Sequence, residues 1–157
     1  MKWVLSDMRA QYEAAVQEEE KGTDFWHHMS AYQGLDAVTL AYKASARALM
    51  ARVGWNPFDK LTHVKASMKL FREAIQIDPQ HLEVRFLRFA IQHHLPSIID
   101  ESENLEEDKA VMMTQFPNYP HAQLSRTHAE AFLRFFKESG RFTTEEITRL
   151  EQDLASS

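Results

Sequence analysis

Two arginines on a strongly apolar segment, residues 82–95, are the side chains best suited to chemistry in this chain. Arg85, Arg88 and Gln92 are spaced i, i+3 and i+7, which places them on one face of a helix. Two guanidinium groups and an amide on one face could hold a carboxylate or a phosphate, with bidentate hydrogen bonds from arginine. These three residues are therefore the candidate binding residues of the sequence.

A structural role is the competing interpretation of the same arginines. Apolar residues surround most of the 82–95 helix and predict that it is central, and an unpaired buried charge costs several kcal/mol. Six of the nine residues 100–108 are acidic, and this segment lies close enough in sequence to fold back. We expect an arginine–carboxylate network between the two segments in preference to an open ligand site.

The eight histidines of the chain invite a metal-site hypothesis, but their spacing does not support one. Helical metal sites use His pairs at i, i+4 or Glu-x-x-His, and neither pattern occurs. Adjacent side chains on a helix diverge by about 100°, and residues seven apart are roughly 10 Å apart. We predict no metal site and no cofactor for these residues: His27, His28, His63, His81, His93, His94, His121 and His128.

Other reaction types are excluded by what the sequence lacks. The absence of cysteine removes thiolate catalysis, cysteine-ligated zinc and iron–sulfur clusters. There is no glycine-rich phosphate loop and no nucleophile-elbow motif. We therefore predict no catalytic residue and expect that the chain is not an enzyme.

The charge is unevenly distributed although the net charge is only −5. Residues 43–72 carry seven basic side chains against Asp59 alone, while the segments on either side are acidic. This basic block is most simply a solvated face, and the alternative is a surface for an anionic partner. A nucleic-acid partner is not expected, because no recognition motif accompanies the charge.

Helical periodicity covers nearly the whole sequence, and no convincing strand pair is present. We expect a single all-α domain over residues 1–157, with seven or eight helices in antiparallel hairpins. Asp36, Asn56 and Thr143 are the clearest predicted N-caps, and Gly22 is a predicted helix stop. The expected helices span about 6–20, 24–33, 37–53, 57–77, 80–94, 104–115, 121–139 and 144–155, with Asn104 capping the sixth and a loop over 116–120.

Apolar stripes also predict which side chains form the core. On the fourth helix the predicted buried stripe begins at Phe58 and Leu61 and continues to Ile75. The three tryptophans, Trp3, Trp26 and Trp55, are expected to anchor the core or its boundary.

The segment 71–79 resembles the second half of a tetratricopeptide repeat (TPR), a family that packs helical hairpins into arrays. Phe71, Ala74 and Pro79 match the aromatic, small and proline positions, and Ser67 matches the preceding small position. The next repeat does not continue regularly. The chain as a whole resembles small helical proteins with no assigned activity. The resemblance implies a TPR-like helical scaffold that binds protein, and it carries over no catalytic residue.

These observations favour a non-catalytic scaffold or protein–protein interaction module. The alternative is a small-ligand binder or an enzyme with Arg85, Arg88 and Gln92 around a pocket. No apolar run approaches the ~18–20 residues of a membrane span, and no signal peptide is visible at the start. We therefore expect a cytoplasmic protein with no membrane partner; the oligomeric state is left open.

Overall fold

The computed structural model describes residues 4–95 and 102–157, and this part of the chain contains helices but no strand. The all-α class with eight helices is therefore confirmed. Trp3 and the acidic residues Asp100 and Glu101 lie outside the described residues. The elements are α1 (Leu5–Gln17), α2 (Lys21–Ala31), α3 (Ala37–Leu49), η1 (Met50–Val53), α4 (Pro57–Ile77), α5 (Leu82–His94), α6 (Ser102–Gln115), η2 (Phe116–Ala122), α7 (Arg126–Ser139) and α8 (Thr144–Ala155).

The three predicted N-caps are confirmed, and each satisfies a backbone N–H that the helix itself cannot bond. The Thr39 N–H donates to Asp36 at 3.1 Å, and the Asp59 N–H donates to Asn56 at 2.9 Å. Thr143 forms a complete capping box at the start of α8, because its hydroxyl accepts from the Glu146 N–H at 3.1 Å and Glu146 accepts from the Thr143 N–H at 2.8 Å.

Several predicted boundaries are wrong. Gly22 does not stop a helix but lies in the first turn of α2, where an added Cβ would come within 3.2 Å of the Arg52 guanidinium. Asn104 lies inside α6. The predicted loop at 116–120 is the 3-10 helix η2, which contains a kink at Asn118, and α7 starts only after the cap Ser125. The kinked 3-10 segment accommodates Pro117 at its start and Pro120 inside it, which a regular α-helix would not.

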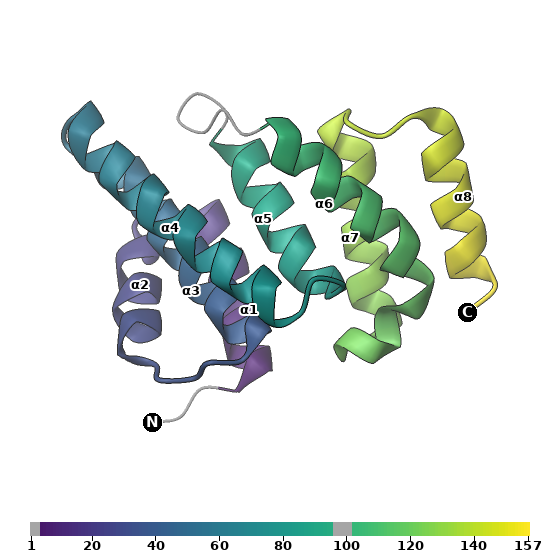
Figure 1. Cartoon of the computed structure of the whole chain (residues 1–157), viewed down its shortest axis with the longest axis horizontal. Helices are drawn as coiled ribbons and strands as arrows, with labels where there is room; N and C mark the ends of the chain where they lie inside the picture. The colour runs from purple at the N-terminus through teal and green to yellow at the C-terminus, as the bar shows by residue number, and fades with distance from the viewer. Residues whose placement is uncertain (1–3, 96–101) are drawn as a thin grey trace.

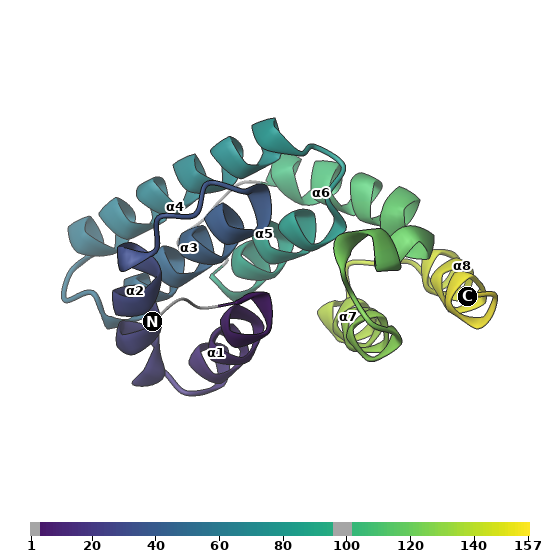
Figure 2. The same ribbon diagram turned by 90° about the horizontal axis from the view of Figure 1, so that it is seen from below.

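α5 is the shared centre of the molecule and packs against two hydrophobic clusters (Figures 1 and 2). Val84, Leu87 and Ile91 face the cluster formed with α1–α4, whereas Phe89 faces the cluster formed with α6–α8. Phe86 contacts both clusters. Figure 2 shows α1 and α7 on the same side of the molecule, with a gap between them. One face of the central helix α5 therefore lies between α1 and α7.

The start of α4 contradicts the predicted core. Trp55 is 96% exposed, Phe58 77% and Leu61 42%, although Phe71 and Ala74 further along the helix are fully buried. The hydroxyl of Ser67 donates to the Ala44 carbonyl at 2.7 Å and so fixes the register of the α3–α4 hairpin. In this register the first turn of α4 lies beside the short η1 rather than beside α3. The apolar stripe of α4 therefore extends beyond the end of α3, and its first residues are left uncovered.

Candidate functional site

Arg85 and Arg88 are joined to carboxylates of α6 in a buried network. Arg88 binds Asp108 in a bidentate manner, with Nε to Oδ2 at 2.8 Å and Nη2 to Oδ1 at 2.7 Å. Arg85 donates to the same Asp108 at 3.0 Å, to Glu107 at 2.7 Å and to the Pro79 carbonyl at 3.0 Å. Both arginines are 4% exposed and Asp108 is fully buried. The structure thus forms the arginine–carboxylate network that the sequence suggested.

The electrostatics of this network fit a structural role. Burial raises the pKa of the Asp108 carboxyl, and the hydrogen bonds from Arg88 and Arg85 act in the opposite direction. The hydrogen bond from Arg85 lowers the pKa of Glu107. Gln92 is also buried, and none of the three predicted binding residues lines the cleft between α1, α5 and α7 that is described below. An anionic ligand at the arginines would have to displace Asp108.

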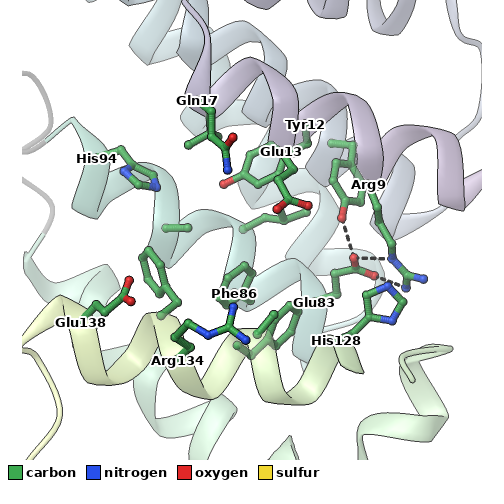
Figure 3. Close-up of a pocket in the computed structure, with 17 residues that line it drawn as sticks. Arg9, Tyr12, Glu13, Gln17, Glu83, Phe86, His94, His128, Arg134 and Glu138 are labelled. Atoms are coloured by element: carbon green, nitrogen blue, oxygen red, sulfur yellow. Dashed lines mark hydrogen bonds and ion pairs between the residues drawn. The ribbon is translucent and has the colours of Figure 1, made fainter. Parts of the chain in front are cut away.

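A cleft of about 340 Å³ lies instead between α1, α5 and α7 (Figure 3). α5 forms its floor, and α1 and α7 form its two walls. The lining is mainly apolar, with charged side chains of both signs at the edges, and the cleft is open to solvent. The lining residues are Arg9, Tyr12, Glu13, Val16, Gln17, Tyr42, Glu83, Phe86, Leu87, Ala90, His94, His128, Ala131, Phe132, Arg134, Phe135 and Glu138.

A buried carboxylate closes one end of this cleft. Glu83 is 2% exposed and accepts two hydrogen bonds from Arg9, at 2.8 Å from Nε and 2.7 Å from Nη2. The Tyr42 hydroxyl donates to the same carboxylate at 2.5 Å (Figure 3). Burial and the adjacent Glu83 charge raise the pKa of Tyr42 well above its ordinary value, so its phenol stays protonated and keeps donating. The triad fixes α1 and α3 on α5 and gives the cleft a rigid end.

Aromatic rings hold the opposite wall in place. Phe86 on α5 stacks on Phe132 of α7 with ring centroids 3.8 Å apart and planes 4° apart. Phe135 meets Phe86 edge-on at 5.4 Å and contacts the His94 ring at 5.8 Å. Aromatic pairs of this kind contribute about 0.5–1.5 kcal/mol beyond the area they bury. The apolar surface of the cleft is therefore formed in advance of any ligand.

The edges of the cleft are polar on both walls. Glu13 and Gln17 project from α1, and Arg134 and Glu138 project from α7 (Figure 3). His94 lies at the end away from Glu83. An apolar floor between edges of mixed charge suits an amphipathic ligand, because apolar groups can enter while polar groups stay hydrated at the rim.

His94 predicts a pH dependence of stability. Burial, and then the positive charges of His93 and Arg52, lower its pKa in the folded state. The unfolded chain therefore binds the proton more readily than the folded chain. The contribution of neutral His94 to the free energy of unfolding is fully present above the ordinary histidine pKa of about 6.5, and it is lost as the pH falls through the lower pKa of His94 in the folded state. We expect a lower melting temperature at mildly acidic than at neutral pH, and a smaller difference in His94→Gln. An unchanged difference in that variant would show that other groups cause the effect.

No local pattern in the sequence predicts this cleft. Arg9 and Glu83 are 74 residues apart, so no local spacing connects them. The one available signal is Glu83 itself, an acid at the start of an apolar helix that needs a distant cation. Phe135 is half-buried and contributes to the cleft wall, while its neighbour Phe136 is fully buried.

Metal binding and membrane crossing find no support among the described residues. No group of three or more His, Asp or Glu side chains there is arranged to hold a metal ion. No helix among them combines the length and apolar character that crossing a bilayer requires.

Comparisons of the chain with family models, with curated proteins and with solved structures find no match. The class that fold and site define is an all-α domain with an open, partly apolar cleft.

Proposed function

We propose that this chain is a non-catalytic interaction module that binds a short amphipathic segment of a partner protein in the cleft between α1, α5 and α7. The observation that carries the proposal is the preformed apolar lining of the cleft, in which the half-buried rings of Phe86 and Phe135 lie against the buried Phe132, in a site that is open to solvent between α1 and α7. Exposed apolar surface in a concave site is characteristic of recognition rather than of stability.

The size of the cleft suggests what part of the partner enters it. At about 340 Å³ the cleft is near the lower end of the range for ligand sites, about 300–1,000 Å³. It therefore suits two or three apolar side chains rather than a whole helix. A partner helix lying across the opening would present such side chains at i, i+3 and i+4, and its polar residues would meet Glu13, Arg134 and Glu138.

The helical hairpins support the same proposal. Ser67, Phe71 and Ala74, the positions that resemble a TPR hairpin, are buried between helices. A rigid hairpin scaffold positions a recognition surface without contributing chemistry, which is how TPR-like domains are expected to bind protein. We therefore include in the proposal that the helical hairpins of this chain have a TPR-like architecture.

Ala131→Trp is expected to abolish binding because the indole would fill the cleft from α7, where Ala131 is exposed. Peptides would first be selected from a random library on the unmodified protein and then titrated against each variant. We expect a loss of affinity of at least tenfold, about 1.4 kcal/mol or more. The matched control is Ala155→Trp, an equally exposed alanine on α8 outside the cleft.

Selected peptides that bind Ala131→Trp as tightly as the unmodified protein would place recognition elsewhere. A library that yields no binding peptide would also contradict the proposal.

A further inference from the structure

The end of η1, the connection after it and the first turns of α4 form an apolar tip that the cleft does not explain. Val53, Trp55, Phe58 and Leu61 are all exposed, and Trp55 has almost no neighbour covering it. In Figure 2 α4 runs along an outer edge of the molecule, and in both views its first turns lie at one end of the molecule (Figures 1 and 2). We define these four residues as the apolar tip. A tip of this kind projects outward and is not a groove that could enclose a partner's side chain.

A basic stripe continues from the apolar tip along the same helix face. At about 100° per residue, Lys65, Lys69 and Arg72 fall within a narrow sector that also contains Phe58. All three cations are exposed, while Val64 and Phe71 on another side of the helix are buried. The stripe from Phe58 to Arg72 is about 21 Å long, at 1.5 Å per residue.

The charges of this stripe are available to a partner. Within the described residues, Lys65, Lys69 and Arg72 form no ion pair with a carboxylate. Other cations of the basic block are engaged, because Arg52 donates to the Ala15 and Val16 carbonyls and Lys60 donates to the Ala51 carbonyl. The face therefore combines a protruding aromatic tip with a row of free positive charge.

From this combination we propose that the outer face of α4 docks on an anionic phospholipid surface. Tryptophan and phenylalanine partition into the interfacial region of a bilayer, and lysine and arginine beside them are attracted to acidic headgroups. A planar, deformable bilayer accepts a convex tip, whereas a protein partner would have to supply a matching pocket. This departs from the expectation of no membrane partner, which was argued for the whole chain and from the absence of a spanning segment; surface binding depends on the local charge and needs no span.

The test is co-sedimentation of the purified chain with two kinds of vesicle, phosphatidylcholine alone and phosphatidylcholine mixed with phosphatidylserine. We expect binding to the mixed vesicles that weakens with added salt, and weak or no binding to phosphatidylcholine alone. Trp55→Ser combined with Phe58→Ser should weaken binding about tenfold or more, and Lys65→Glu combined with Lys69→Glu should do the same. The control is Leu35→Ser, which changes an apolar residue that is also 77% exposed but lies outside the apolar tip.

A second measurement reports on insertion directly. Brominated lipid should quench tryptophan fluorescence when the chain binds, and Trp55→Phe should remove most of this quenching. All the altered side chains are exposed, so circular dichroism should show each variant folded.

Absence of binding to mixed vesicles would overturn the proposal. Binding to polyglutamate without binding to vesicles would also overturn it and would assign the face to an acidic protein partner. A dimer that dissociates in Trp55→Ser, together with no binding to vesicles, would assign the face to self-association. Cleft peptides and the Ala131→Trp variant serve as a separate readout, because the cleft and the α4 face share no residue.

Discussion

Replacing Arg88 with alanine is expected to lower the free energy of unfolding by about 3–5 kcal/mol. The change removes both guanidinium hydrogen bonds from Arg88 to Asp108, which is fully buried, and leaves the 3.0 Å contact from Arg85. A buried carboxylate that loses its main partner is costly, because neither water nor another donor can replace the lost bonds. Urea unfolding followed by circular dichroism measures the loss.

Two further variants separate the network from a general effect of removing arginine. Arg72→Ala removes an exposed arginine on α4 and should change stability by no more than about 0.5 kcal/mol. Arg88→Lys keeps the charge but cannot bind Asp108 in a bidentate manner, so it should give an intermediate loss. A melting temperature of Arg88→Ala within a degree or so of the parent would contradict the buried network.

Glu83→Ala is expected to cost about 3 kcal/mol, the second large effect. Glu83 is the common acceptor for Arg9 and Tyr42, so its removal leaves a largely buried guanidinium and a buried phenol without their partner. Tyr42→Phe is the matched control, because it removes one donor and keeps the Arg9–Glu83 ion pair. It should cost less than Glu83→Ala, about 1.5 kcal/mol, the lower value for a hydrogen bond to a charged group.

The informative result is which of these two variants loses more stability. If Tyr42→Phe is as damaging as Glu83→Ala, the ion pair contributes nothing and the rigid end of the cleft depends on the tyrosine alone. If Glu83→Ala leaves stability unchanged, the triad does not fix α1 on α5.

The helices and the arginine network could be predicted from the sequence because their signals are local. Asp36, Asn56 and Thr143 each cap a helix through a backbone N–H only three residues away. Asp108 lies only 20 residues from Arg88, and the short connection from α5 to α6 makes their pairing easy to anticipate.

The cleft and the apolar tip could not be predicted in the same way, because each depends on which helices become neighbours. Arg9, Glu83 and Phe132 come from three helices that are distant in sequence, and helical periodicity says nothing about their assembly. Phe58 continues a correct apolar stripe but lies beyond the helix that would bury it. Periodicity identifies a face that is apolar, and only tertiary packing determines whether that face is covered.

The proposed binding function is tested most directly by nuclear magnetic resonance, by titrating a selected peptide into the labelled protein. The methyl groups of Val16, Leu87, Ala90 and Ala131 line the cleft from all three helices and report on its occupation. We predict that their signals shift together as the peptide is added, and that Ala131→Trp eliminates the shifts. Shifts confined to other parts of the chain, with these four signals unchanged, would contradict the proposal that the cleft is the recognition site.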